Sequence, residues 1–442
     1  MLFQSLYIHL RFYGFLIFFI GLFITAFIFP GLLPWVWVAF GLFAAFVVVD
    51  YSLLFLKKNG ITAVRTTPEK LSNGDVNHIG IQLKNHYDWT ANLQLIDEIP
   101  FQFQERHFEI DRSIAPGQEV ALNYALRPTA RGEYTFGNLN IYVSSPLGLL
   151  SKRYRFDANQ TVPTYPSFLH MKQYDLLAFS KYKQPYGFRK IRKLGTTTEF
   201  EQIKEYVSGD DIRTINWKAT AKKNQLMVNQ YQDENAQSIY LIIDKGRVMK
   251  MPFEGLSLLD YAINATLALS HVILKKKDKL GLFTFSKKID NRVAAESKSV
   301  QMRQIMEQLY RIDTDFHESD YSKLYADVKR NLSQRSLLIL FTNFETLDGL
   351  NRQLPYLRGL AKNHLLLLVF FENSELHELT QQKAVHIQDI FDRVIAEKFN
   401  HEKRLIVNEL RKYGIYSVLT PPEKLSMDTI NAYLEIKARG II

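Results

Sequence analysis

The chain has 442 residues, 47% of them hydrophobic and 23% charged, with 55 Lys and Arg against 45 Asp and Glu. This length suggests several domains, and the composition is that of folded protein rather than long disorder. There is no cysteine, which excludes disulfides, thiolate catalysis and cysteine-ligated zinc sites.

Two long apolar runs lie near the start of the chain. Phe12–Phe29 is uncharged, and a second run extends over Leu32–Val49, or to Leu56 if Asp50 lies at an interface. About 17–25 apolar residues cross a bilayer as a helix, so residues 1–58 are predicted to form a two-helix membrane anchor with the lipid bilayer as partner. A cleaved signal peptide is the alternative for the first run, but no small-residue cleavage site follows it.

Basic residues flank this predicted anchor. Arg11 precedes the first run, and Lys57 and Lys58 follow the second. Positive charges are enriched on the cytoplasmic side of membrane proteins. Both ends of the hairpin, and the soluble domains that follow Asn59, are therefore predicted to face the cytoplasm.

Residues 60–165 show the pattern of β-strands. Apolar and polar residues alternate with a period of two, and turn sequences such as Ala115–Gln118 interrupt the runs. Short strands at this spacing, with no helical stretch between them, predict a small all-β sandwich. The predicted strands include Val76–Leu83, Ala91–Ile96, Glu119–Leu126 and Tyr134–Tyr142.

Residues 166–235 are predicted to form a basic linker followed by a signature segment. Between Pro166 and Gly195, seven Lys and Arg residues stand against one acid. A solvated loop, or attraction to anionic lipid headgroups, is expected for such a charge run after a membrane anchor. Nucleic-acid binding is disfavoured because no recognition motif accompanies the charge.

Strands and helices alternate over residues 236–442. The run Leu365–Phe371 is continuously apolar, which indicates a strand buried on both faces of a parallel sheet. The alternation predicts a doubly wound α/β domain. The other predicted strands are Ser238–Ile243, Leu280–Phe285, Ser336–Thr342 and Ile415–Leu419, and the predicted helices include Leu256–Lys276, Val300–Tyr310 and Glu402–Lys412.

The most distinctive stretch lies between these two predicted domains and combines acidic, basic and aromatic residues. It resembles the signature of the domain of unknown function 58 family, bacterial membrane proteins that occur with MoxR-type AAA+ ATPases. Arg131–Tyr134 and Ser145–Leu150 also resemble the sandwich of that family. The resemblance implies a von Willebrand A-like fold for the α/β domain, a MoxR-type ATPase as partner, and a multi-pass protein of the bacterial cytoplasmic membrane. The signature positions are Glu199, Glu201, Glu205, Tyr206, Gly209, Asp210, Asp211, Arg213, Asn216 and Trp217.

The carboxylates of this segment admit three interpretations. Asp210 and Asp211 follow Gly209 in a predicted turn, where carboxylates accept backbone N–H groups. A network of ion pairs that fixes the sandwich to the α/β domain is the expected role. A metal site or acid–base pair, and a docking surface for a partner protein, are the alternatives.

The resemblance also implies a candidate metal site after the first α/β strand. Von Willebrand A domains bind a divalent cation through Asp-x-Ser-x-Ser and through a Thr and an Asp of later loops. Here Asp244 matches, both serine positions differ, Ser319 offers a hydroxyl, and Asn343 stands where an Asp is expected. A hard cation such as Mg²⁺ prefers several oxygen ligands, anionic ones included. No cofactor is therefore expected; Mg²⁺ at Asp244 and Ser319 is the alternative, and Lys245 or Arg247 are candidate counter-charges in its place.

Standard catalytic motifs are absent from the sequence. The chain lacks the glycine motifs of phosphate loops, dinucleotide-binding turns and nucleophile elbows, and His377–Gln381 matches a zinc-protease motif only in part. We therefore predict a non-enzymatic, membrane-anchored scaffold. The resemblance implies an adaptor through which a MoxR-type ATPase assembles or remodels client proteins. A static envelope protein without an ATPase, and a hydrolase built on the Glu199–Asp211 carboxylates, are the alternatives.

Overall fold

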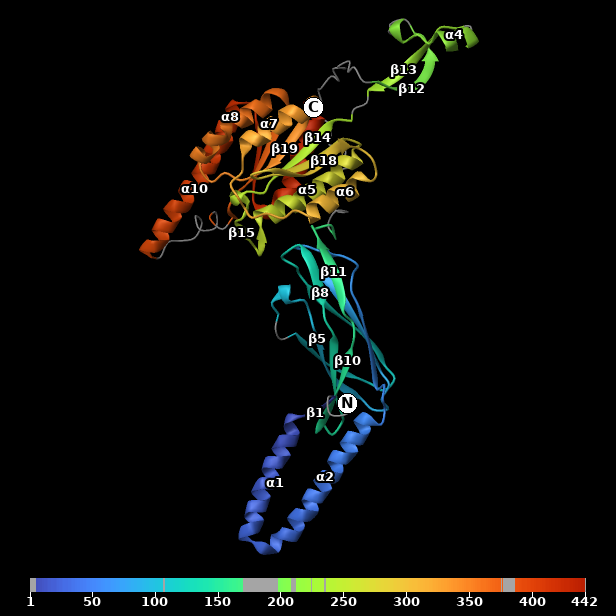
Figure 1. Ribbon diagram of the computed structural model, residues 1–442, viewed down its shortest axis with the longest axis vertical. Coiled ribbons are helices and arrows are strands. Elements are labelled where there is room, and N and C mark those ends of the chain that lie inside the picture. Colours follow the sequence, from blue (N-terminus) through green and yellow to red (C-terminus); the bar gives the residue numbers. More distant parts are fainter. Residues whose placement is uncertain are drawn as a thin grey trace. The chain divides into compact units, whose positions relative to one another are not determined.

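The computed structural model of the protein (Figure 1) describes residues 5–105, 108–169, 198–207, 212–223, 225–233, 236–374, 376 and 386–441. The chain divides into two units, Met1–Leu169 and His170–Ile442. The first unit holds two apolar helices and an all-β region, and the second holds a β-hairpin segment and a mixed α/β domain. The predicted order of N-terminal helices, β region and α/β domain is confirmed.

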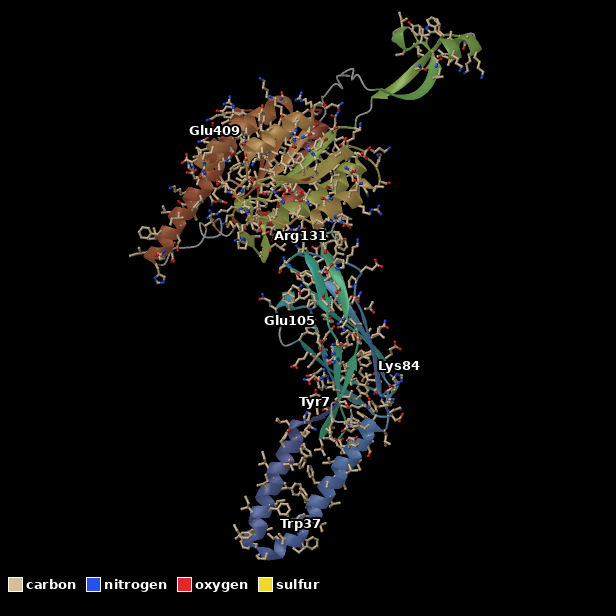
Figure 2. All side chains as sticks on the ribbon, in the orientation of Figure 1. Tyr7, Trp37, Lys84, Glu105, Arg131 and Glu409 are labelled. Atoms are coloured by element: carbon tan, nitrogen blue, oxygen red, sulfur yellow. The ribbon has the colours of Figure 1, made fainter. Side chains whose placement is uncertain are left out.

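The two apolar helices are α1 (Leu10–Ile28) and α2 (Leu33–Phe55), joined by the 3₁₀ turn Pro30–Leu32. Both are long and apolar enough to cross a membrane. They contact each other through aromatic rings such as Phe19 and Phe43, whose centroids lie 5.3 Å apart. Most of their remaining apolar side chains are exposed, including Trp37 near the turn (Figure 2). Water disfavours so large an apolar surface, whereas a bilayer would cover it.

The all-β region consists of three sheets that share one hydrophobic core. Their strand orders are β1-β10-β9-β5-β6, β2-β4-β7 and β3-β11-β8. Inward-facing side chains alternate with exposed ones, as the period of two predicts. The strands are β1 (Leu6–Ile8), β2 (Ile61–Thr66), β3 (Leu71–Ser72), β4 (Asn77–Asn85), β5 (Ala91–Asp97), β6 (Glu109–Ile114), β7 (Glu119–Leu126), β8 (Gly132–Phe136), β9 (Leu139–Ser144), β10 (Leu150–Phe156) and β11 (Gln160–Tyr165).

One predicted strand is wrong in a way that has a clear cause. Tyr134–Tyr142 is two strands, β8 and β9, which belong to different sheets. The break falls at Gly137, where a side chain would lie 2.5 Å from Glu98 Oε2. That carboxylate accepts the backbone N–H of Asn138 at 2.8 Å and the Asn140 amide through its other oxygen at 2.8 Å. The chain therefore turns a corner between sheets around Glu98.

The α/β domain has one six-stranded sheet in the order β18-β17-β14-β19-β20-β21. Neighbouring strands are parallel except β17 and β18, which are antiparallel. Every residue of β20 is buried, as its apolar run predicts. The chain adds β17 and β18 on one side of β14 and then β19, β20 and β21 on the other side. This reversal of strand order at β14 is that of doubly wound sheets. The strands are β14 (Ser238–Asp244), β17 (Lys279–Phe285), β18 (Ile289–Glu296), β19 (Leu337–Phe341), β20 (Leu365–Phe371) and β21 (Tyr416–Thr420).

Six helices of the described chain surround this sheet in two groups, α5 with α6 and α11, and α7 with α8 and α10 (Figure 1). α10 begins fifteen residues before the predicted Glu402, and its first half exposes five apolar side chains at helical spacing, from Ile387 to Ile395. The helices are α5 (Leu258–Lys275), α6 (Gln301–Tyr310), α7 (Tyr321–Asn331), α8 (Leu347–Asn363), α10 (Ile387–Lys412) and α11 (Leu425–Ala438).

Candidate functional site

Asp244 is the last residue of β14, at the centre of the α/β sheet. β14 has a parallel neighbour on each side, β17 and β19. Ligands of open α/β sheets bind beyond the carboxyl ends of the strands, at the point where the strand order reverses. The predicted site residue therefore lies where this fold places its ligands.

Four hydrogen-bond donors converge on the Asp244 carboxylate, which is completely buried. Oδ1 accepts from Ser319 Oγ and, at 2.8 Å, from the backbone N–H of Gly246. Oδ2 accepts from Thr342 Oγ1 at 2.7 Å and from the Tyr321 hydroxyl at 3.2 Å. A carboxylate offers about four lone-pair positions. The Tyr321 hydroxyl also lies 2.7 Å from Thr342 Oγ1, so its one proton is shared between two acceptors. The protein's own donors therefore occupy both oxygens of Asp244.

Burial dominates the electrostatics of this cluster. Desolvation raises the pKa of Asp244, although hydrogen bonds from Ser319 and Thr342 oppose the shift. Burial likewise raises the pKa of Tyr321 well above its ordinary value, and the Asp244 charge adds to that effect. Tyr321 is thus held as a neutral hydrogen-bond donor, which suits a structural cluster better than proton transfer near neutral pH.

Gly246 explains how Ser319 reaches Asp244. A side chain at position 246 would lie 2.0 Å from Ser319 Oγ and 2.9 Å from Asp244 Oδ1. A β-carbon at position 246 would require the Ser319 hydroxyl to move, so glycine at this position leaves room for Ser319, from a distant loop, to donate to Asp244.

The lysine next to Asp244 points elsewhere. Lys245 Nζ donates to Asp290 Oδ2 at 3.1 Å and to the carbonyl of Asp313 at 3.2 Å. The side-chain donors to Asp244 are all hydroxyls, from Ser319, Thr342 and Tyr321. Hydroxyls and one backbone N–H thus stabilise the carboxylate, where the sequence had suggested Lys245 or Arg247 as its counter-charge.

Asn343 also has a charged partner of its own. Its Oδ1 accepts from Lys403 Nζ at 2.8 Å, and the same ammonium lies 3.4 Å from Glu345. Burial lowers the pKa of Lys403, while Glu345 opposes that shift. An ammonium group therefore lies against Asn343, and a cation at this point would meet its positive charge.

The donor set around Asp244 fits Mg²⁺ poorly. It provides one carboxylate and three hydroxyls, and those hydroxyls donate to the carboxylate rather than leaving its oxygens open to a hard cation, which prefers several oxygen ligands, anionic ones included. Among the residues that the structure describes, no three His, Asp or Glu side chains are grouped so that they could hold a metal ion. Asp244 and Ser319 are brought together, but as hydrogen-bond partners.

The signature segment forms a separate small element. β12 (Thr198–Glu205) pairs with β13 (Met227–Asp233), and between them lie the 3₁₀ turn Ile212–Thr214 and the short helix α4 (Trp217–Lys223). Gly209, Asp210 and Asp211 lie outside the described residues, as do residues 170–197 of the basic linker and the side chains of Glu199, Glu201 and Arg213. The proposed role of these carboxylates stays a prediction.

Asn216 fixes the start of α4 onto β13. Its Oδ1 accepts the backbone N–H of Ala219 at 3.0 Å, which caps the helix, and its Nδ2 donates to Asn229 Oδ1 at 2.8 Å. The backbone N–H of Asn216 donates to the Met227 carbonyl at 2.8 Å. Trp217, the next residue, is therefore presented from a backbone held by three hydrogen bonds.

The described part of this hairpin exposes large apolar side chains. Trp217 and Ile212 are each 70% exposed, Val207 63% and Leu226 47%. α4 also carries three lysines and no acid. An exposed apolar group with a polar border is typical of protein interaction sites.

Sequence reasoning missed one further cluster, at the junction of α2 with the all-β region. Asp50 of α2 is completely buried. Its carboxylate accepts from Ser145 Oγ and from the backbone N–H groups of Leu149 and Leu150, at 3.1 and 2.8 Å. Two residues after Leu150, Lys152 Nζ donates to the carbonyl of Leu54 in the last turn of α2 and to that of Lys57 just after it, each at 3.1 Å. The Ser145–Leu150 loop, whose sequence resembles that of the family, is thus bound to α2 through buried polar groups.

Comparison with known proteins finds a family model that matches part of the signature segment and most of the α/β domain. Residues 202–402 match the family described as "Protein of unknown function DUF58". The Uncharacterized protein YeaD of Bacillus subtilis (strain 168) is 23% identical over 170 residues, which are 38% of this chain and 40% of that protein. This chain therefore spans less than half of that relative's length.

Solved structures resemble parts of the chain at low identity. The conserved hypothetical protein BatB from Bacteroides thetaiotaomicron is 13% identical with a TM-score of 0.30, over 46% of this chain and 98% of that chain. The CARDB domain of the PF1109 protein from Pyrococcus furiosus is 15% identical with a TM-score of 0.17, over 24% of this chain and 86% of that chain. The PapD-like domain of human CEP192 is 12% identical with a TM-score of 0.20, over 25% and 87%.

Proposed function

We propose that this chain, whose residues 202–402 match the DUF58 family, is a membrane-anchored protein-interaction scaffold. In this proposal α1 and α2 span the bacterial cytoplasmic membrane, and the all-β and α/β domains face the cytoplasm. The scaffold is an adaptor for a MoxR-type AAA+ ATPase that assembles or remodels other proteins. The ATPase as partner follows from the family resemblance alone.

The junction at Asp50 supports an anchoring role for the helices. Buried polar contacts with Ser145, Leu149 and Leu150 tie α2 to the all-β region, and β1, just before α1, pairs with β10. Both ends of the hairpin are therefore attached to the domain that follows it. A signal sequence cleaved after the first helix would leave the β1–β10 pairing unmade.

The exposed Trp217 is the observation that carries the interaction role. Interface energy is concentrated in a few aromatic and arginine side chains, and rigid presentation lowers the entropy lost on binding. Asn216 supplies that rigidity through its bonds to Ala219 and Asn229. Trp217, Ile212 and Val207 are each exposed on the hairpin, and a partner protein would cover them in this proposal.

The α/β domain supports binding rather than catalysis. We infer a von Willebrand A-like domain from the Asp244 position at the switch point of a doubly wound sheet, together with the family resemblance. The hydroxyl cluster and the Lys403–Asn343 bond replace the divalent cation in this proposal. The fold keeps its ligand-side surface while the metal chemistry of the family is lost.

The test is affinity capture of the full-length protein from membranes in the presence and absence of ATP. Three forms are compared: wild type, Trp217→Ala, and Phe101→Ala, a matched control because Phe101 is 85% exposed in the all-β region. We expect wild type and Phe101→Ala to recover an AAA+ ATPase in a nucleotide-sensitive manner, and Trp217→Ala to recover about tenfold less. Equal recovery by all three forms would show that the hairpin is not the docking site. Capture of envelope proteins with no ATPase would favour a static structural role.

A further inference from the structure

A row of small polar side chains crosses the outer face of the five-stranded sheet. Strand register places Tyr7 opposite Ser151, Ser151 opposite Ser144, Ser144 opposite Asn92, and Asn92 opposite Ser113. Directly opposite residues on neighbouring strands have side chains on the same face. Four of the five side chains in this row are short, so they leave a low strip, a depression along the middle of this face of the sheet.

The next row on the same face is taller and bounds this low strip. Gln94 lies opposite both Tyr142 and Asp111. Tyr142 contacts Tyr7 edge to face, with ring centroids 4.9 Å apart, and Arg153 donates to the Tyr7 hydroxyl at 3.1 Å. The two tyrosines thus form one wall of a groove of about 950 Å³. Pockets that bind small molecules are commonly about 300–1,000 Å³.

The groove is lined by groups that both donate and accept hydrogen bonds. Ser113 Oγ donates to Asn92 Oδ1 at 2.6 Å, and the hydroxyls of Ser144 and Ser151 lie 2.9 Å apart. An amide or hydroxyl side chain keeps further donor and acceptor capacity after one such bond. A ligand rich in hydroxyl groups matches this lining, because each of its hydroxyls also donates and accepts.

Charge in the groove argues against an anionic ligand. Its lining residues include the carboxylate of Asp111 and the imidazole of His9, and the Arg153 guanidinium lies against Tyr7 on the same face. Arg112 is opposite the buried Leu93, so its side chain belongs to the other face of the sheet. Phosphate recognition normally uses an excess of arginine or lysine. A lining with balanced charge, many neutral polar groups and two aromatic rings suits a neutral sugar, whose C–H faces can stack on tyrosine.

The groove also touches the start of the membrane helix. Ile8, His9 and Leu10 line it, and Leu10 is the first residue of α1. Tyr7 lies beside this junction (Figure 2). If α1 spans the bilayer, which rests on the proposed function, the groove lies at the level of the lipid headgroups. We propose that it binds a glycosyl group, supplied either as the headgroup of a glycolipid or as a soluble saccharide.

Two substitutions test the groove without entering the hydrophobic core. Ser113→Phe fills the low strip from the exposed edge strand β6, and Asn92→Ala removes an amide from its centre. Gln82→Phe is the control, because Gln82 is exposed on β4, in another sheet. Circular dichroism and thermal melting establish that all three variants fold like the wild type.

The experiment uses the full-length protein in phosphatidylethanolamine nanodiscs, purified without sugar-based detergents, which would compete for the groove. One arm adds monoglucosyl diacylglycerol to the nanodiscs and reads bound lipid by native mass spectrometry. The other arm titrates methyl glucoside by saturation-transfer NMR. We expect wild type and Gln82→Phe to bind in at least one arm, and Ser113→Phe and Asn92→Ala to bind at least about tenfold more weakly.

The arms separate the two sugar sources, and membrane fractionation separates this inference from the proposed function. Binding in the lipid arm alone identifies a glycolipid, and binding in the second arm identifies a soluble saccharide. Binding that is equal in all variants, or absent from both arms, refutes the sugar site even if the protein fractionates with membranes. Retention of phosphatidylglycerol in preference to the glucolipid, lost in Arg153→Ala, would show an anion site instead. A chain found free of membranes would refute the anchor, while methyl glucoside binding could still stand.

Discussion

Asp50 offers a sharp test of how the hairpin of α1 and α2 is joined to the all-β region. Asp50→Ala removes the acceptor of three buried donors, namely the N–H groups of Leu149 and Leu150 and the hydroxyl of Ser145. Each of these residues is at most 5% exposed, so water cannot readily replace the carboxylate. An unsatisfied buried donor costs about 1–3 kcal/mol. The three together should cost about 3–9 kcal/mol of unfolding free energy.

Asp50→Asn should be milder, because one amide oxygen can still accept from both N–H groups while Nδ2 donates to Ser145 Oγ. We expect it to cost about 1–2 kcal/mol. The assay is thermal unfolding of the full-length protein in detergent, followed by limited proteolysis of the all-β region. At about 2–4 °C for each kcal/mol in a domain of this size, Asp50→Ala should lower the midpoint by about 6 °C or more.

Asp88→Ala is the matched control for this experiment. Asp88 is also bound near the end of α2, through an ion pair with Lys57, but the Asp88 side chain is 93% exposed. Exposed ion pairs contribute little, so its midpoint should stay within about 2 °C of wild type. The reasoning is refuted if Asp50→Ala melts as close to wild type as Asp88→Ala does.

Two other sites give further predictions. Asp244→Ala should destabilise the α/β domain by about 3–5 kcal/mol, since it strands the hydroxyls of Ser319, Thr342 and Tyr321, whereas Asp244→Asn should cost much less. Because burial raises the pKa of Asp244, the folded state holds the proton more tightly than the unfolded state. The free-energy cost of ionising Asp244 in the folded state therefore grows as pH rises above about 4. Thermal melts should show the midpoint of Asp244→Asn rising relative to that of wild type from pH 4 to 8. A constant difference between the two midpoints would contradict this account. Asn216→Ala should loosen α4 by about 1–2 kcal/mol, seen as faster hydrogen exchange of its amides, whereas Asn216→Asp should keep the helix cap and most of the protection.

Much of the fold was predictable because its signals are local. The continuous apolar run Leu365–Phe371 is strand β20 with all residues buried, since only a strand covered on both faces accommodates such a run. The first half of α10 was missed, although its apolar residues from Ile387 to Ile395 have helical spacing. They are exposed, and the predicted helix began only where apolar residues become core.

Features that depend on distant partners were not predictable. Asp50 looked like an interfacial residue, but its three partners lie 95–100 positions away. Asp244 and Ser319 were selected together through the family motif, whereas Tyr321 and Thr342 carry no local mark of their role. The corner at Gly137 is similar, because alternation continues through it while the chain passes from one sheet to another.

The most direct test of the scaffold proposal is the affinity of the purified full-length protein in nanodiscs for the purified MoxR-type ATPase of its own organism. Wild type, Trp217→Ala and the Phe101→Ala control should be titrated with and without ATP. The proposal predicts nucleotide-dependent binding that Phe101→Ala preserves and that Trp217→Ala weakens about tenfold or more. No measurable binding of the wild type, or equal affinity of all three forms, would contradict it.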